Sequence, residues 1–239
     1  MRLHRLVLMT ALLLGAAQAL AHPRVLVFTR TEGFRHDSIP AAVEALRRLA
    51  AEEGLGFAHS EDPAVFDDAA LADVAVVVFA NTTGEAVPPP HQGALERFVR
   101  RGGGYLGIHA AADTGYDWPW YGGLVGAWFL SHPPGLQTAR VHAEPADPDA
   151  PAWRVTDEFY DFRENPRPRV RVIARLDTAD HREGRMGADH PIAWCHDYDG
   201  GRAWYTGLGH TEALYRDPRF LEHLRAGLRW SAGLQPDCR

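Results

Sequence analysis

Short runs of apolar residues alternate with amphipathic segments through the first half of this chain, and that alternation restricts the fold more than any other feature. The run VAVVVFA at 74–80 is apolar at every position, as is typical of a parallel strand covered on both faces. Further strands are expected at 24–30, 56–60 and 105–108, and helices at 39–53 and 91–102. Strand–helix–strand units at this spacing build a parallel sheet with helices on both faces.

The second half of the chain alternates more between apolar and polar residues, which predicts antiparallel strands. Strands are expected at 137–145 and 169–176, a hairpin over 191–209 that turns at Asp199–Gly201, and a last helix at 218–233. We therefore expect one domain over residues 22–235, a flavodoxin-like three-layer α/β sandwich with a mainly parallel sheet and an antiparallel extension. The segments 114–135 and 143–168 are expected to be long and irregular, and such loops are often functional.

The first 21 residues have the pattern of a secretory signal peptide. Arg2 and Arg5 precede the apolar run at 6–14, and Ala19-Leu20-Ala21 is a small-residue cleavage site. The apolar run is short for a membrane-spanning helix. The mature protein is therefore expected to be secreted or periplasmic, with no membrane span after cleavage of the signal.

The net charge of the chain restricts the classes of partner that it can bind. The formal net charge is −6, and loss of the two arginines of the signal changes it to −8, with 23 basic residues against 31 acidic ones. This balance disfavours nucleic acid and anionic membranes as partners, and it leaves a homo-oligomer open.

The two cysteines, Cys195 and Cys238, exclude a disulfide framework. Export would permit one bridge, but a strand position and a position near the chain end do not favour it.

Polar side chains follow several expected strands directly, at the edge where an open α/β sheet binds its ligands. Three of the 13 histidines follow three different strands, namely His36, His109 and His210. The other polar residues at these strand ends are Glu32, Arg35, Asp37, Asn81–Thr83, Asp113, Thr211 and Glu212. Convergence of these residues on one edge is the main indication of a functional site.

His109 has the most informative position. It lies in GGGYLGIHAAADT (102–114), a glycine-rich turn from strand to helix, and turns of this kind expose a side chain above the sheet. Several α/β enzymes carry a nucleophilic Ser or Cys there. The alternative is a buried imidazole with satisfied hydrogen bonds. His210 follows Gly207 and Gly209, which let the backbone approach closely, and it has the same two interpretations.

Structural roles also remain open for the other strand-end residues. Asp37 or Ser38 can cap the helix at 39–53, and His36 can bond loop backbone. The residues 81–83 fit an ordinary turn, which we favour there.

Aromatic residues crowd the segment TGYDWPWYGGLVGAWFLSHP (114–133). Aromatic rings pack against the C–H faces of sugars, so Trp118, Trp120 and Tyr121 are candidates for sugar binding, with His132 where the segment returns to the site. A hydrophobic lid over the sheet edge explains the same residues. The acidic run DEFYDFREN (157–165) could supply acid–base groups, but a solvated loop is favoured.

At these stretches the chain resembles the trehalose-utilisation (ThuA-like) family. The matching runs are GFRHDSI, GGGYLGIHAAADT, WPWYGGLVGAWFLSHP, DEFYDF, HPIAWCH and GRAWYTGLGHTEALYRDPRF. They occur in order over nearly the whole mature chain. The resemblance implies a class I glutamine amidotransferase-like fold, in agreement with the strand and helix pattern. It also implies a link to oxidised (3-keto) glycosides and disaccharides.

The comparison with amidotransferases bears on the catalytic residues. Enzymes of that fold carry a Cys in a G-x-C-x-G turn and complete it with His and Glu in an H-P-E stretch. This sequence resembles the pattern at GIHAA and GHTE, so His109 falls at the nucleophile position and His210 and Glu212 match the other two members. An imidazole lacks the thiolate that attacks a carboxamide, so glutaminase activity is not expected.

The first function compatible with these residues is an enzyme of carbohydrate metabolism that moves protons on a keto-sugar or keto-glycoside. A 3-keto group acidifies the neighbouring C–H, and His109 and His210 would exchange the proton, with Glu212 orienting one ring. The expected substrate-binding residues are Arg35, His36, Asp37, Asp113, Trp118, Trp120, Tyr121 and His132.

Two other functions stay open. The second is a metal-dependent hydrolase or lyase that uses Zn²⁺ or another divalent ion. Its expected ligands are His36, His109, His132 and His210, with Asp37 or Glu158. No H-x-x-x-H or H-E-x-x-H motif is present, so these ligands would converge from separate loops. The third is a non-catalytic carbohydrate-binding or interaction module, whose affinity would follow the Trp118–Trp120 loop.

Overall fold

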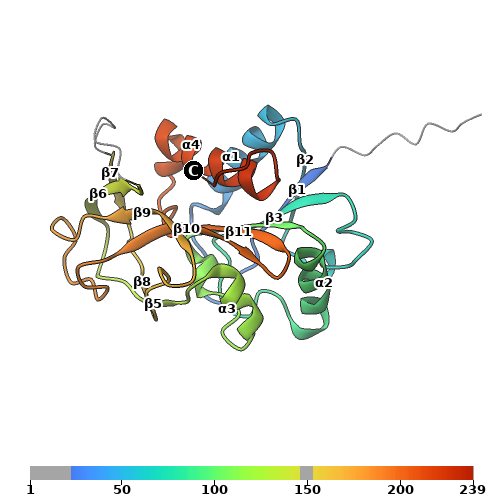
Figure 1. Ribbon diagram of the computed structural model, residues 1–239, viewed down its shortest axis with the longest axis horizontal. Coiled ribbons are helices and arrows are strands. Elements are labelled where there is room, and N and C mark those ends of the chain that lie inside the picture. Colours follow the sequence, from blue (N-terminus) through green and yellow to red (C-terminus); the bar gives the residue numbers. More distant parts are fainter. Residues whose placement is uncertain (1–22, 146–152, 239) are drawn as a thin grey trace, which may run out of the picture.

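The computed structural model describes residues 23–145 and 153–238, so the expected signal peptide lies outside the described residues. The parallel strands are β1 (Arg24–Phe28), β2 (Gly56–Ser60), β3 (Val74–Ala80), β4 (Gly104–Ile108) and β11 (Gly201–Thr206). The antiparallel strands are β10 (Pro191–Tyr198), β9 (Arg171–Leu176), β6 (Gln137–Ala143) and β7 (Trp153–Asp157). Within the described part of the chain they form one sheet in the order β2-β1-β3-β4-β11-β10-β9-β6-β7 (Figure 1). The expected parallel sheet with an antiparallel extension is confirmed.

Helices cover both faces of the parallel half (Figure 1). The helices α1 (Ile39–Glu52) and α4 (Pro218–Ser231) pack on one face, and α2 (Pro89–Arg100) and α3 (Pro119–Val125) on the other. The side chains of β3 show why its sequence is apolar throughout. Val76 and Val78 belong to the core beneath α1 and α4, whereas Val77 and Phe79 belong to the core beneath α2 and α3. Both faces of this strand are therefore dry, as in a three-layer sandwich.

The segments expected to be irregular contain short regular elements. The stretch 114–135 holds α3 and β5 (Phe129–Ser131), and 143–168 holds β7 and β8 (Asp161–Phe162), which pairs with β5. The late hairpin turns as expected, because Asp199 and Gly200 both have positive φ angles, 46° and 96°.

Two expectations about side chains are corrected. Ser38 occupies the N-cap position of α1, but its hydroxyl does not cap the helix and donates instead to the carbonyl oxygen of Gly209 at 3.2 Å. Cys195 on β10 and Cys238 near the chain end are joined by a disulfide, which the sequence did not favour. Both cysteines are buried, because the C-terminal tail folds back onto the core beneath α4. Among the described residues, no helix has the length and hydropathy needed to cross a membrane.

Candidate active site at the carboxyl edge of the sheet

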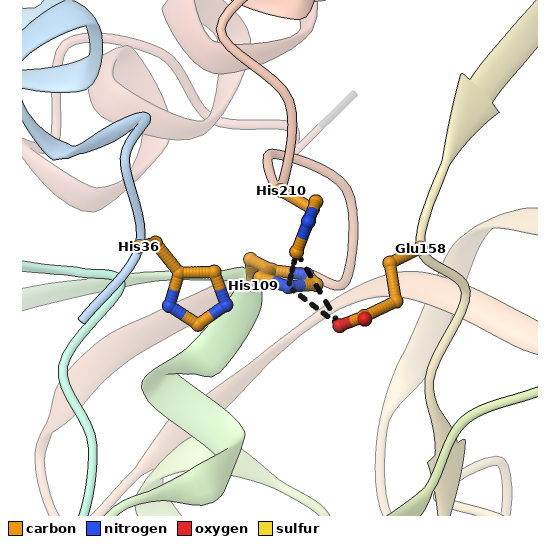
Figure 2. Close-up of side chains that lie close together, drawn as sticks. All are labelled: His36, His109, Glu158 and His210. Atoms are coloured by element: carbon orange, nitrogen blue, oxygen red, sulfur yellow. Dashed lines mark hydrogen bonds and ion pairs between the residues drawn. The ribbon is translucent and has the colours of Figure 1, made fainter. Parts of the chain in front are cut away.

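Three strands of the parallel half deliver histidines to one edge of the sheet. The strands β1, β4 and β11 run in the same direction, and His36, His109 and His210 follow their carboxyl ends. The centroids of the three imidazole rings lie 4.9, 5.1 and 5.2 Å apart. Figure 2 shows Glu158 approaching the same point from the side opposite His36. The fold thus brings together four residues that are distant in the sequence, and we call them the His–Glu cluster.

The backbone of His109 directs its side chain into this cluster. The residue begins a short 3₁₀ turn (His109–Asp113) with a φ of 48°, a conformation that residues with a Cβ seldom adopt. Its ring is fully buried, and Nδ1 lies 2.9 Å from the carbonyl oxygen of Gly207. A carbonyl can only accept, so Nδ1 carries the hydrogen and Nε2 keeps its lone pair. Tyr160 packs on the ring at a centroid distance of 4.1 Å and fixes its plane.

The atoms that face one another in the cluster form a nearly equilateral triangle (Figure 2). The Nε2 of His109 lies 3.3 Å from the Nδ1 of His210, and these nitrogens lie 3.5 and 3.4 Å from the Oε2 of Glu158. All three atoms can present a lone pair to the same point. A hydrogen on the Nδ1 of His210 can bond one of the other two atoms, whereas a metal ion at that point can bind all three.

Solvent access divides the residues around this triangle. His36 and His109 are 4% and 0% exposed, so their rings form the floor of the site. The side chains of Glu158, His210 and His132 are 13%, 26% and 37% exposed. A substrate can therefore contact the second group and not the first. His109 cannot exchange a proton directly with a substrate, which changes the role expected from its position.

The charge states of Glu158 and His210 depend on each other. Burial opposes ionisation of Glu158, but hydrogen bonds and charges from His109 and His210 outweigh it and lower the pKa of the carboxyl group. The hydrogen bond with Glu158 raises the pKa of His210, against the effect of burial. Burial, together with the neighbouring imidazoles, lowers the pKa of His36 to about 3, so this ring is neutral at pH 7. The cluster therefore joins a carboxylate to rings of different basicity.

Asp157 holds the segment that carries His210. Its buried carboxylate accepts hydrogen bonds from the backbone N–H groups of Gly209, His210 and Thr211, at 2.7, 3.4 and 3.0 Å. Burial raises the pKa of Asp157, although these N–H groups and the nearby imidazoles oppose that shift. These bonds bring the end of β7 against the residues that follow β11. Glu158 reaches the cluster because it is the next residue along the chain.

His132 lies beside the other oxygen of Glu158. Its Nδ1 lies 3.2 Å from the Oε1 of Glu158 and 2.9 Å from the carbonyl oxygen of Pro133. Both neighbours of Nδ1 are acceptors, so this nitrogen carries the hydrogen and Nε2 is left with a free lone pair. A carboxylate that orients an exposed imidazole in this way is the arrangement expected of a general base.

Glu212 does not lie in the cluster. Its exposed carboxylate is 3.8 Å from the guanidinium group of Arg216, on the adjoining turn. The carboxylate beside the imidazoles is Glu158, so the expectation that Glu212 orients one of the rings does not hold. The GHTE motif locates His210 correctly in space, but the acidic partner comes from another strand end.

The expected sugar-binding aromatic residues lie elsewhere. Trp118 is 5% exposed, and its indole N–H donates to Glu96 on α2. Trp120 stacks on Trp118 and donates to Asp199 of the late hairpin, while Tyr121 is buried in the core. These rings pack α3 onto the sheet, which corrects their assignment as a wall of the site.

The other expected substrate-binding residues have mixed positions. Arg35 and Asp37 are exposed in the loop that carries His36, and Arg35 pairs with Glu61 at 2.7 Å. Asp113 is half-buried, and the hydroxyl of Tyr116 donates to it at 2.5 Å. Burial raises the pKa of Asp113, although this hydrogen bond opposes the shift.

The site also uses residues of the acidic run DEFYDFREN, for which a solvated loop was the favoured interpretation over acid–base groups. Asp157 and Tyr160 have structural roles next to the imidazoles, and Glu158, which was also an expected metal ligand, lies in the cluster. All three lie in a stretch expected to be a solvated loop. The alternation of apolar and polar residues from Trp153 to Thr156 was the available sign of a strand that ends at Asp157, directly before Glu158.

The His–Glu cluster can accommodate a metal ion. His36, His109, Glu158 and His210 each offer one ligand atom, and these atoms lie within 4.8 Å of one another. Three of the four histidines expected as metal ligands are thus brought together, while His132 lies outside this set and contacts Glu158.

Comparison with known proteins identifies the family of this chain. The family model described as "ThuA: Trehalose utilisation" matches residues 24–231, so the chain belongs to the ThuA family. None of the curated proteins matches the chain.

Several solved structures are similar in fold. A ThuA-like protein from Bacteroides uniformis has a TM-score of 0.71 at 21% identity, covering 90% of this chain and 94% of its own. One from Parabacteroides merdae has a TM-score of 0.72 at 18% identity, covering 90% and 91%. A β-galactosidase from Bacillus circulans sp. alkalophilus has a TM-score of 0.59 at 14% identity, with 90% of this chain matching 32% of that one. At these identities the likenesses show a shared fold.

Proposed function

We infer that this protein is an enzyme of carbohydrate metabolism that moves protons on a keto-sugar or keto-glycoside, with the His–Glu cluster as its catalytic centre. The observation that carries this inference is the triangle of facing atoms on His109, His210 and Glu158, beside an imidazole oriented as a base. Membership of a family described as trehalose utilisation supports a carbohydrate as the substrate.

The chemistry follows from what a ketone does to its neighbours. The C–H bond next to a ketone is acidic, and loss of its proton leaves negative charge on the ketone oxygen. The free Nε2 of His132 accepts that proton, while the electron pair of the C–H bond forms a C=C bond and the carbonyl π electrons move to oxygen. Positive charge at the centre of the cluster, beside His210, would stabilise the oxygen.

The enolate formed in this way has two outcomes. It can expel a substituent on the next carbon, such as a glycosidic oxygen, which takes the electron pair of the broken C–O bond. It can instead take back a proton, which gives isomerisation. Neither outcome needs a protein nucleophile, in agreement with an imidazole at the position where amidotransferases carry their Cys.

A non-catalytic sugar-binding module is less well supported. That function would place the aromatic segment at the ligand, but Trp118 is buried against Glu96 and Trp120 is bonded to Asp199. The polar residues gathered at the sheet edge are instead those that transfer protons.

The proposal is tested by incubating the mature protein with native and 3-keto disaccharides and following consumption by mass spectrometry. We expect only the 3-keto disaccharides, and not the native ones, to be consumed. His132→Gln should lower turnover by about 10²–10⁴-fold, the usual contribution of a general base. A matched control is His142→Gln, because His142 has the same side-chain exposure of 37% and also pairs with a carboxylate, that of Asp177. Unchanged turnover in His132→Gln, or an equal loss in both variants, would contradict the proposed base.

The proposal includes export from the cytoplasm, as the first 21 residues predict. The disulfide between Cys195 and Cys238 supports it, because disulfides persist in oxidising compartments. Mass spectrometry of the protein from extracytoplasmic fractions should find a chain that begins at residue 22. A full-length chain confined to the cytoplasm would exclude export.

A further inference from the structure

We propose that the His–Glu cluster binds one divalent transition-metal ion, with His36, His109, His210 and Glu158 as its ligands and Zn²⁺ as the best match. A catalytic role for the ion rests on the proposed function, whereas binding of the ion rests on the geometry alone.

The spacing of the ligand atoms fits a coordination shell. Nitrogen and oxygen ligands bind Zn²⁺ at about 2.0–2.1 Å, so neighbouring ligands of a tetrahedral ion lie about 3.4 Å apart. The triangle of His109 Nε2, His210 Nδ1 and Glu158 Oε2 has sides of 3.3, 3.4 and 3.5 Å. These distances are long for hydrogen bonds that involve a carboxylate, which are about 2.7–2.9 Å. An ion just outside the plane of the triangle satisfies all three atoms, whereas one shared proton cannot.

The ring positions agree with the same geometry. The centre of an imidazole lies about 1.1 Å behind its nitrogen, so three rings on a tetrahedral ion have centroids about 5.2 Å apart. The rings of His36, His109 and His210 are 4.9, 5.1 and 5.2 Å apart, and each pair is close to perpendicular. Figure 2 shows the His36 ring turned toward His109 from the side opposite Glu158. His36 therefore completes the shell from the remaining direction.

Neighbouring groups orient the ligand residues through hydrogen bonds, as groups just outside the coordination shell do in known metal sites. His109 donates its Nδ1–H to the carbonyl oxygen of Gly207, which leaves Nε2 free to bind an ion. His132 contacts the Oε1 of Glu158 and leaves Oε2 directed at the imidazoles. Asp157 fixes the backbone of His210. Three of the four ligands are thus oriented before an ion arrives.

The donor set also selects the class of ion. Three imidazoles and one carboxylate suit Zn²⁺ and its neighbours in the first transition series, whereas Mg²⁺ prefers oxygen ligands and water. The bound ion would supply the positive charge that the proposed reaction needs at the ketone oxygen. Zn²⁺ can expand to five ligands, so a substrate oxygen can add to the four protein ligands. His132 remains outside the shell and keeps its role as the base.

The test is a metal titration of the mature protein, produced without a polyhistidine tag and stripped with a chelator. Equilibrium dialysis against Zn²⁺, with the metal measured by mass spectrometry, should give one ion per chain. Co²⁺ should produce visible absorption bands typical of nitrogen-rich four- or five-coordinate sites, and Mg²⁺ should not displace Zn²⁺. Less than half an equivalent of Zn²⁺ at saturating concentration would overturn the proposal.

Variants separate this site from adventitious surface binding. Loss of a group that only hydrogen-bonds to a metal ligand lowers metal affinity by about 10–100-fold. His210→Ala and Glu158→Gln each remove a ligand, so each should weaken Zn²⁺ affinity by more than that. His132→Gln removes a group that contacts a ligand but is not one, so this variant should still bind one equivalent of Zn²⁺. The surface control His142→Ala should bind Zn²⁺ with the affinity of the wild type. Equal affinity in His210→Ala, Glu158→Gln and His142→Ala would refute the assignment. Circular dichroism establishes that each variant is folded before its affinity is compared.

The outcomes distinguish this inference from the proposed function. One bound ion in a protein that leaves every keto compound unchanged supports the metal site and removes the proposed substrate class. If metal-free protein still turns over a keto compound, the metal site has no catalytic role, and the proposed proton transfer remains supported.

Discussion

At the scale of single residues, the site depends on an imidazole in a left-handed backbone conformation at a strand end. The sequence GGGYLGIHAAADT predicted the position of His109, because glycine-rich turns after parallel strands have a recognisable pattern. The acidic partner was not predictable in the same way. Glu212 matched a motif, but its carboxylate points to Arg216, whereas Glu158 reaches the cluster through the contacts of Asp157 with distant backbone.

The two carboxylates give a direct comparison at this scale. Glu158→Gln removes the negative charge shared by the imidazoles, and we expect turnover of a keto-glycoside to fall at least about 100-fold. Glu212→Gln removes only an exposed charge 3.8 Å from Arg216 and should leave turnover within about two-fold, as expected of surface pairs. Steady-state kinetics of both variants decide the point. A large loss in Glu212→Gln with little change in Glu158→Gln would reverse the assignment.

At the scale of elements, the site is assembled where the antiparallel extension meets the parallel half. The alternation of strands and helices predicted the parallel sheet and the helices on both faces, because these patterns are local. It did not predict β7, whose short sequence lies between proline-rich segments, or the way its end contacts the residues after β11. Such contacts join residues more than 50 positions apart, and local patterns carry no information about them.

Asp157 is the link between these elements, and its removal tests the assembly. Asp157→Ala leaves three backbone N–H groups without their acceptor, which we expect to lower the free energy of unfolding by about 2–4 kcal/mol. Asp157→Asn keeps one acceptor oxygen and should lose less. Urea denaturation followed by tryptophan fluorescence measures both. A loss in Asp157→Ala below about 0.5 kcal/mol, typical of a surface substitution, would show that this link is not structural.

At the scale of the whole molecule, the fold joins a dry three-layer core to a polar edge rich in histidine. Not all histidines belong to the site. His190 is buried behind Tyr160, and its Nε2 donates to the carbonyl oxygen of that residue at 2.9 Å. Burial lowers the pKa of His190 from 6.5 to about 4, although this hydrogen bond opposes the shift.

This buried ring predicts a dependence of stability on pH. Between pH 6.5 and pH 4 the unfolded chain binds a proton at His190 that the folded chain does not, so acidification through this window favours unfolding. The contribution is at most about 1.4 kcal/mol per pH unit. His190→Gln can keep the hydrogen bond to Tyr160 but does not titrate, so its free energy of unfolding should fall less steeply between these pH values. Parallel curves for the wild type and His190→Gln would contradict the shifted pKa.

The central claim is that His132 removes a proton from the carbon next to a ketone while the His–Glu cluster stabilises the ketone oxygen. Nuclear magnetic resonance of a 3-keto disaccharide in D₂O with the mature protein tests it most directly. We predict that the C–H signal next to the ketone disappears with the wild type and His142→Gln, through exchange or elimination, and persists with His132→Gln. A signal that persists with the wild type, at a concentration where the disaccharide binds, would contradict the claim.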